Sequence, residues 1–222
     1  MKRMRSMRTF PAWMLVKNMF EHELNGTQLD ILFGSVFDKA MVKMNYYYKR
    51  GVDDFLEAAL KYMSSILDHE AAILGIKLMP DQRDNILSRG KAMLDAFKST
   101  PAFGLLRPKT RLVVIDDLVG VYVQPDFYDG ETIYEVKTFD PRGVNYVKYQ
   151  VKLFQLGYPG SKAILIGFDK ATNKPIILTI DPINDVDKNE LMKQALAFGL
   201  INGAEEEPST TITIRYNTKD PA

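Results

Sequence analysis

The chain has 222 residues, of which 46% are hydrophobic and 26% charged, and its net charge is +1. This size and composition are those of an ordinary globular protein, and we expect residues 1–222 to form a single domain. The absence of cysteine excludes disulfides, thiolate catalysis, cysteine-ligated zinc and iron–sulfur clusters.

Only two histidines, His22 and His69, are present, which argues against a histidine-based triad or a histidine-rich metal site. No run of 18 apolar residues occurs, so the sequence predicts no membrane span and a cytoplasmic protein.

Residues 1–106 are predicted to be mainly helical. Pro11 can open a helix that runs through Phe20 and closes near Asn25-Gly26. Apolar residues at helical spacing predict three further helices, over Gln28–Tyr48, Val52–Gly75 and Pro80–Ser99. A basic cluster precedes them and is predicted to be a solvated tail, with contact to nucleic acid as the alternative: Lys2, Arg3, Arg5 and Arg8.

Residues 107–216 are predicted to form the sheet, because the hydrophobic period changes there from helical to two. Three consecutive antiparallel strands are expected, over Arg111–Ile115, Val119–Tyr128 and Thr132–Phe139. The remaining elements are, in order, a helix at Tyr146–Leu156, strands at Ala163–Phe168 (central and buried) and Pro175–Ile180, a helix at Asp185–Leu200, an acidic turn at Glu205–Glu207 and an edge strand at Thr210–Tyr216. The predicted fold class is α/β, with one mixed α+β sheet flanked by helices and a helical N-terminal extension.

The stretch Gly120–Lys137 carries the chemistry. Asp129-Gly130 predicts a two-residue type I′ turn, which would pair Tyr128 with Glu131. The same register pairs Asp126 with Ile133, and Gln124 with Glu135. Because side chains alternate along a strand, four polar residues would share one face: Gln124, Asp126, Glu135 and Lys137. The opposite face is apolar and would be buried: Val119, Val121, Val123, Tyr134 and Val136.

In this register Asp126 and Glu135 are diagonal neighbours, with Cα atoms about 7–8 Å apart. Two carboxylates at that spacing can share one Mg²⁺ (or Mn²⁺), which prefers oxygen ligands. Lys137, beside Glu135, would orient a water or meet a scissile phosphate. The alternative is an exposed hairpin in which Lys137 and Glu135 form a plain salt bridge.

Pro125-Asp126 followed by Glu135-Val136-Lys137 in consecutive strands resembles the PD-(D/E)XK nuclease superfamily, nearest its RecB-like and Holliday-junction-resolvase branches. Two features extend the resemblance. The helical segment Gly34–Asp38 matches a Gly that precedes a His or acid by four residues, and Gln150 matches the Gln of a Gln-x-x-x-Tyr motif whose Tyr is replaced here by Phe154. The short, cysteine-free chain also resembles small nucleases of crenarchaeal viruses.

The resemblance implies a restriction-endonuclease-like core and Mg²⁺-dependent hydrolysis of DNA to 5′-phosphate and 3′-hydroxyl ends, on branched or recombination intermediates. It implies Asp126 and Glu135 as metal ligands, Lys137 as a catalytic residue, and Asp38 as a third ligand. Gln150 would hydrogen-bond the carboxylates or a DNA phosphate. Three other acids compete with Asp38 for the third position: Asp30, Glu21 and Glu57.

A near-neutral protein needs a local basic surface to bind DNA. The candidates, besides the N-terminal basic cluster, are Arg107, Lys109, Arg111, Lys148 and Lys152. For Lys148 and Lys152 the alternative is a solvated helix face. A junction resolvase cuts two strands symmetrically, so we expect a homodimer, in the host cytoplasm if the protein is viral. Two other functions stay open: a DNA-structure-binding module with weak or no catalysis on the same fold, and an α/β interaction protein.

Overall fold

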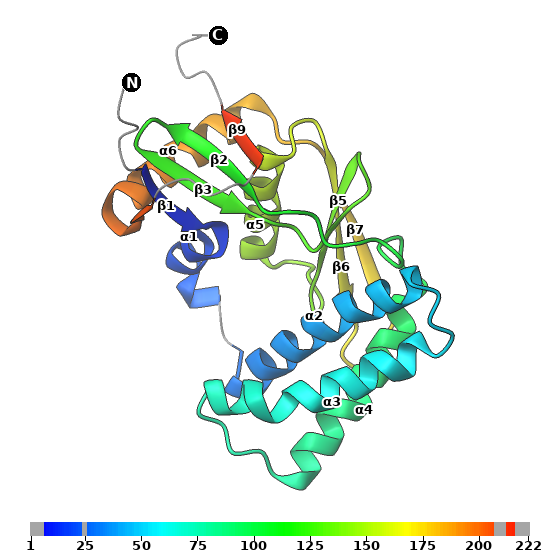
Figure 1. Cartoon of the computed structure of the whole chain (residues 1–222). Coiled ribbons are helices and arrows are strands. Elements are labelled where there is room, and N and C mark those ends of the chain that lie inside the picture. The colour runs from blue at the N-terminus through cyan, green and yellow to red at the C-terminus, as the bar shows by residue number, and fades with distance from the viewer. Residues whose placement is uncertain (1–6, 24–25, 207–211, 216–222) are drawn as a thin grey trace.

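The structure is a computed structural model, and it describes residues 7–23, 26–206 and 212–215. These residues form six α-helices and two small mixed sheets, so the fold is mixed α/β with a helical region in the N-terminal half (Figure 1). Over the described part of the chain, no helix is both long and apolar enough to cross a membrane.

The helices follow the prediction closely. Their bounds are α1 (Ala12–Met19), α2 (Gln28–Lys49), α3 (Phe55–Ile73), α4 (Pro80–Phe97), α5 (Asn145–Gly157) and α6 (Asp185–Asn202). Thr27 and Asp30 form a capping box that fixes the start of α2, and Pro80 opens α4. The first helix ends earlier than predicted, at Met19, and a 3₁₀ turn (η1, Glu21–Glu23) follows it.

The strands form two sheets, so the prediction of a single mixed sheet is wrong. The five-stranded sheet has the order β8–β1–β3–β2–β9 and the four-stranded sheet the order β4–β5–β6–β7. The bounds are β1 (Met7–Pro11), β2 (Arg111–Asp116), β3 (Val119–Val123), β4 (Phe127–Tyr128), β5 (Thr132–Val136), β6 (Lys162–Phe168), β7 (Pro175–Ile180), β8 (Ala204–Glu206) and β9 (Ile212–Arg215). As predicted, β6 is central in its sheet and largely buried.

The predicted strand Val119–Tyr128 is broken at Gln124–Asp126, and its two parts belong to different sheets. Pro125 explains the break, because proline has no N–H to donate to a strand ladder. Gln124 turns away instead and donates from its side chain to the carbonyl of Pro108 at 2.8 Å. The expected set of three consecutive antiparallel strands is therefore wrong: β3 pairs with β2, whereas β5 pairs with β4 and β6.

The predicted hairpin register is also wrong, by two residues. Tyr128 pairs with Ile133 and Phe127 with Tyr134, so the connection is longer than a two-residue turn. The Asp129 carboxylate causes this, because its Oδ1 accepts hydrogen bonds from the N–H groups of Glu131 and Thr132 at 2.9 and 2.8 Å. Asp126 comes just before the first paired residue, and its carboxylate accepts a hydrogen bond from the N–H of Val136, next to Glu135, at 2.8 Å.

Two strands, β1 and β8, were not predicted from the sequence. Met7–Pro11 is not a tail but strand β1, which pairs in parallel with β3; Arg8 lies in it and donates to the carbonyl of Leu200. Lys2, Arg3 and Arg5 lie outside the described residues. The acidic turn predicted at Glu205–Glu207 is wrong for Glu205 and Glu206, which belong to β8, and Glu207 lies outside the described residues. The described part of the predicted last strand is β9, an edge strand as expected.

The four-stranded sheet lies between two hydrophobic cores. On one side it shares a core with the five-stranded sheet, α1, α5 and α6; on the other it packs against α2, α3 and α4 (Figure 1). Strand β5 alternates between the two, because Ile133 faces the first core and Tyr134 the second. The end of β5 is thus enclosed from both sides, which places Glu135 in a buried environment.

The loop between α4 and β2 is fixed by one buried side chain, that of Asn45 on α2. Its Nδ2 donates to the carbonyls of Ala102 and Leu105 at 3.0 and 2.8 Å, and its Oδ1 accepts from the N–H of Gly104 at 3.0 Å. Asn45 is fully buried. The loop that leads to Arg107 is therefore held against α2.

We expect Asn45→Ala to lower the free energy of unfolding by about 3 kcal/mol, because it leaves buried backbone groups of this loop without partners. Chemical denaturation measures this. Ser65→Ala is the control, since the Ser65 hydroxyl lies on an exposed helix face and donates to the carbonyl of Tyr62. A loss for Asn45→Ala no larger than that of the control would contradict the account of this loop.

Candidate active site

Asp126 lies where the chain leaves the five-stranded sheet and enters the four-stranded one. Its Oδ2 accepts a hydrogen bond from the backbone N–H of Val136 at 2.8 Å. Its Oδ1 accepts from Nη2 of Arg107, also at 2.8 Å. The bond to Val136 ties the aspartate to β5, the strand that carries Glu135, so the two predicted carboxylates are brought together by backbone geometry.

Glu135 and Lys137 share a face at the end of β5, as predicted. The Lys137 ammonium donates to Glu135 Oε1 at 2.7 Å and to Oε1 of Gln150, on α5, at 2.9 Å. The Lys137 backbone N–H also donates to the carbonyl of Ile166 on β6 at 2.8 Å. The lysine is thus fixed through both its backbone and its side chain, and Gln150 lies in direct contact with it.

Asp38 points from α2 toward Asp126, and Arg107 lies between them. Nη2 of Arg107 donates to Asp38 Oδ1 at 2.5 Å and to Asp126 Oδ1 at 2.8 Å. The two oxygens are therefore no farther apart than the sum of these distances, about 5.3 Å. Gly34 lies one turn before Asp38, and a Cβ there would lie 3.9 Å from Oγ1 of Thr138, so α2 runs close to the segment that follows Lys137.

The electrostatics of the site centre on Asp126. Its burial raises the pKa of its carboxyl well above the usual range, and repulsion by Glu135 and Asp38 raises it further; Arg107 and Lys137 offset this only in part. Burial by itself would lower the pKa of Lys137, but attraction to Glu135 and Asp126 outweighs it, so that pKa is raised. Arg107 and Lys137 thus do not fully neutralise the three neighbouring acids, Asp38, Asp126 and Glu135.

These residues fit a divalent cation by their chemistry. Mg²⁺ uses one or two carboxylates and keeps several waters, and a cation would relieve the repulsion that raises the pKa of Asp126. In the conformation described, however, no three acidic or histidine side chains among the described residues lie close enough together to hold a metal ion. Arg107 lies between Asp38 and Asp126 and pairs with both.

The three acids that competed with Asp38 lie elsewhere. Asp30 accepts hydrogen bonds from the backbone and hydroxyl of Thr27 at the start of α2. Glu21 and Glu57 are exposed, on η1 and α3. The structure thus brings Asp38, of the four, to the two strand carboxylates.

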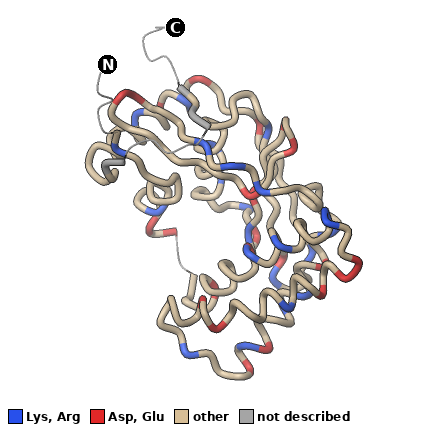
Figure 2. Tube along the Cα trace, viewed as in Figure 1, with Lys and Arg blue, Asp and Glu red and all other residues tan. Residues whose placement is uncertain are grey.

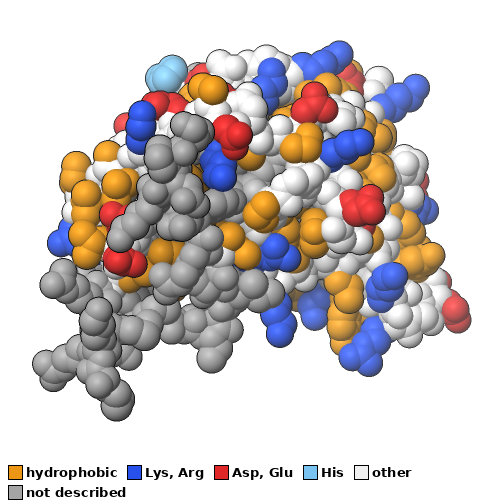
Figure 3. Space-filling model, turned by 90° about the horizontal axis from the view of Figure 1, so that it is seen from above, with side chains coloured by type: hydrophobic (Ala, Val, Ile, Leu, Met, Phe, Trp, Pro, Cys, Tyr) orange, Lys and Arg blue, Asp and Glu red, His pale blue; other side chains and the backbone are white. Residues whose placement is uncertain are grey.

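The predicted basic residues are spread over several elements. Lys148 on α5 and Lys109 before β2 are exposed, whereas the Lys152 ammonium pairs with Asp187 of α6 at 2.5 Å. Charges of both signs are interspersed along the described trace (Figure 2). The face seen from above mixes Lys and Arg with acidic and hydrophobic side chains (Figure 3).

Tyr146 is a site residue that the sequence analysis missed. It precedes Gln150 by four residues on α5 and so lies on the same helix face. Burial raises the pKa of its phenol, Lys137 lowers it, and Glu135 raises it, so the hydroxyl senses both charges of the ion pair. Phe154, one turn after Gln150, is buried. The signal in the sequence was an aromatic residue with a polar tip, one turn before Gln150.

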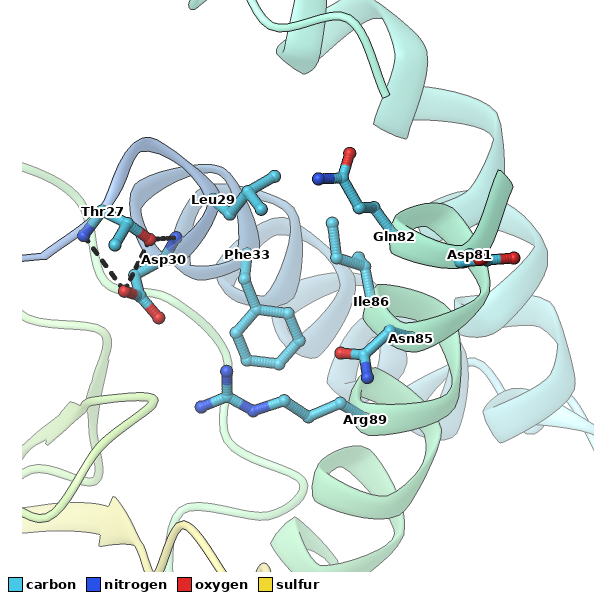
Figure 4. A pocket seen from close by; sticks show the side chains of 9 residues that line it. All are labelled: Thr27, Leu29, Asp30, Phe33, Asp81, Gln82, Asn85, Ile86 and Arg89. Atoms are coloured by element: carbon cyan, nitrogen blue, oxygen red, sulfur yellow. Dashed lines mark hydrogen bonds between the residues drawn. The ribbon is translucent and has the colours of Figure 1, made fainter. Parts of the chain in front are cut away.

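Arg89 was also missed, and it supports the segment after Lys137. Its Nη2 donates to the carbonyl of Thr138 at 2.9 Å, and its guanidinium lies 4.1 Å from the centre of the Phe33 ring. Burial lowers the pKa of Arg89. It lines a hollow of about 420 Å³ between the start of α2 and α4. Figure 4 shows its side chain below the ring of Phe33.

No protein-family model and no curated protein matches the chain. Among solved structures, the chain is similar to one described as the crystal structure of SSO0001, over 88% of each chain, with 14% sequence identity and a TM-score of 0.37. A likeness this low supports no inference about fold or function.

The raised pKa of Asp126 predicts how stability depends on pH in the absence of divalent ions. Because its pKa is higher in the folded than in the unfolded state, deprotonation of this carboxyl costs stability; the cost grows as the pH rises from the unfolded value to the folded-state pKa and is constant above it. The cost is absent below the unfolded value of about 3.9. Asp126→Asn removes it, so we expect the stability of this variant relative to the wild type to increase with pH.

Chemical denaturation at several pH values measures this difference. Asp117→Asn, in the exposed turn between β2 and β3, is the matched control and should show no such trend. A wild type that gains stability over Asp126→Asn with rising pH would show that Arg107 compensates the charge fully, against this account.

Proposed function

We propose that this protein is a divalent-metal-dependent nuclease that hydrolyses phosphodiester bonds of DNA to 5′-phosphate and 3′-hydroxyl ends. One observation carries the proposal: Asp126, Glu135 and Lys137 lie together in a nearly buried cluster, with Asp38 and Gln150 beside them. A surface ion pair would stay in water, because burying charges costs free energy unless partners compensate them fully. The burial of this cluster therefore favours a functional role over a surface ion pair.

Each residue has a role that its contacts support. Asp126 and Glu135 would hold Mg²⁺ or Mn²⁺, with Asp38 as the additional donor; such an ion lowers the pKa of a bound water and polarises the phosphate. Lys137 is fixed between Glu135 and Gln150, where its ammonium can orient the attacking water or offset charge on the phosphate. Gln150 holds that ammonium in place, and Arg89 holds the following residue, Thr138.

The proposal includes a restriction-endonuclease-like core and DNA as the partner. It agrees with the resemblance of Pro125-Asp126 and Glu135-Val136-Lys137 to the PD-(D/E)XK superfamily, and with Gly34–Asp38 lying on a helix that passes close to Thr138, the residue after the lysine. Branched DNA is the substrate class to test first. The two-fold dimer expected of a junction resolvase, and a place in the cytoplasm, stay predictions.

A second function is favoured by a different observation. Arg107 pairs with both Asp38 and Asp126 and so neutralises part of their charge without a metal ion. A site neutralised in this way supports a module that binds DNA structures with little or no cleavage. Metal-stimulated cleavage separates the two functions, because a binding module would bind the same DNA without cutting it.

We expect labelled duplex, flap or four-way-junction DNA to be cut with Mg²⁺ or Mn²⁺ and not with EDTA. Asp126→Asn and Lys137→Ala should each slow cleavage about a hundredfold or more, the loss typical of removing a group that stabilises transition-state charge. Asp117→Asn and Lys162→Ala, which change exposed residues of the same types, should cut like the wild type. No cutting of any substrate by folded wild type would favour the binding module, and activity that survives both site substitutions would place the site elsewhere.

The exposed lysines give a separate prediction about DNA affinity. If Lys109 and Lys148 each meet one phosphate, Lys109→Ala and Lys148→Ala should each reduce the slope of log affinity against log salt by about 0.9. Lys152→Ala is the matched comparison and should change the slope less, because Asp187 already pairs with that ammonium. Fluorescence anisotropy over a salt series measures the slopes, and equal effects of all three substitutions would contradict this assignment.

A further inference from the structure

Arg107 occupies the gap between two acids without belonging to a helix or strand. It lies in the segment 105–110, which has no regular structure and leads from α4 to β2. Its side chain is 30% exposed, and it links Asp38, whose side chain is 38% exposed, to the less exposed Asp126. A side chain placed in this way can change partners by rotating, without movement of the sheets.

The guanidinium uses only part of its bonding capacity. Its Nη2 donates to both Asp38 and Asp126, while its Nε is buried and has no hydrogen-bond partner in the described part of the chain. Nε and Nη2 form one edge of the guanidinium, a fork that matches the two oxygens of a carboxylate or a phosphate. Here one prong is shared by two acids and the other is unpaired, so this is not the most favourable pairing open to Arg107.

The charge balance points the same way. Asp38, Asp126 and Glu135 oppose two cations, Arg107 and Lys137, which leaves the ionised cluster with one excess negative charge. If Arg107 stayed in place, its guanidinium would still pair with two of the three carboxylates, Asp38 and Asp126, and would repel an incoming divalent ion. With Arg107 turned away, the excess becomes two negative charges, which matches the charge of a divalent ion.

We propose that Arg107 is a counter-ion that the divalent cation replaces, and that the released guanidinium fork then binds a phosphate of the DNA strand. This inference rests on the proposed function, and it adds that metal binding and substrate binding are coupled through one side chain. The coupling is reciprocal, as it is for any pair of linked ligands. The ion frees Arg107 for DNA, and DNA that captures Arg107 frees the carboxylates for the ion.

The first test measures binding of Mn²⁺ alone, without DNA, by electron paramagnetic resonance of the free ion. Removing the competing charge in Arg107→Gln should tighten Mn²⁺ binding about fivefold or more, the lower range of typical coupling. Arg107→Lys keeps the charge and should bind Mn²⁺ like the wild type. Arg142→Gln is the control, because Arg142 is exposed and pairs only with Asp140 among the described residues.

The second test measures DNA binding by fluorescence anisotropy, with Ca²⁺ and without divalent ions. Without the ion, wild type and Arg107→Gln should bind DNA equally, since Arg107 is then engaged with Asp38 and Asp126. With Ca²⁺, the wild type should gain affinity and Arg107→Gln should gain about fivefold less. Arg107→Lys, which lacks the fork, should also gain less than the wild type.

The outcomes separate this inference from the proposed function. Thermal unfolding first establishes that the variants are folded; if Arg107→Gln is not, Arg107→Lys with the DNA measurement decides alone. Weaker or unchanged Mn²⁺ binding by folded Arg107→Gln would overturn the inference and assign Arg107 a structural role, while cleavage by the wild type would still stand. A wild type that binds no Mn²⁺ would overturn both.

Discussion

The crowding of charge around Asp126 is the constraint on which the rest of the site depends. The aspartate is placed at the crossing between two sheets, with one oxygen bound to the backbone of β5 and the other to Arg107. Every other charged group nearby acts on it: Glu135 and Asp38 repel its charge, and Arg107 and Lys137 attract it. A buried carboxylate with a raised pKa is unfavourable for stability, and such groups cluster at functional sites.

The fold explains why this crowding persists. Strand β5 is enclosed between two hydrophobic cores, and its end cannot turn toward solvent without opening one of them. Pro125 ends the ladder of β3 and lets the chain change sheets next to that end. Asn45 fixes the loop that leads to Arg107 against α2, the helix that carries Asp38. The cluster is thus assembled by elements distant in sequence, each stabilised elsewhere.

The elements that the sequence predicted well are those with strong local signals. Helix α2 has a capping box and a long apolar stripe, and strand β7 was predicted to the residue, because local periodicity defines both. Strands β1 and β8 were missed, since β1 is held by pairing with β3, more than 100 residues away, and β8 pairs with β1. The predicted hairpin register was wrong because the Asp129 carboxylate accepts hydrogen bonds from N–H groups of its own loop. The general preference for Asp-Gly in two-residue turns does not take such bonds into account.

The site divides in the same way. Asp126, Glu135 and Lys137 could be named from spacing alone, and Gln150 and Asp38 from a family resemblance, because these residues form short motifs. The position of Arg107 could not be predicted, since its partners lie 69 and 19 residues away and only the tertiary structure brings them together. Tyr146 could have been noticed from its spacing of four residues from Gln150. Only the structure shows that this spacing brings its phenol near Lys137 and Glu135.

The central claim, that this cluster holds a catalytic divalent ion, is tested most directly by mapping where an ion binds. Fe²⁺ substituted for Mg²⁺, with ascorbate and peroxide, generates radicals that cut the polypeptide next to the bound metal, and mass spectrometry locates the cuts. The account predicts cuts beside Asp38, Asp126 and Glu135 that excess Mg²⁺ suppresses and Asp126→Asn abolishes. Cuts confined to other segments, or cuts that persist in Asp126→Asn, would contradict it.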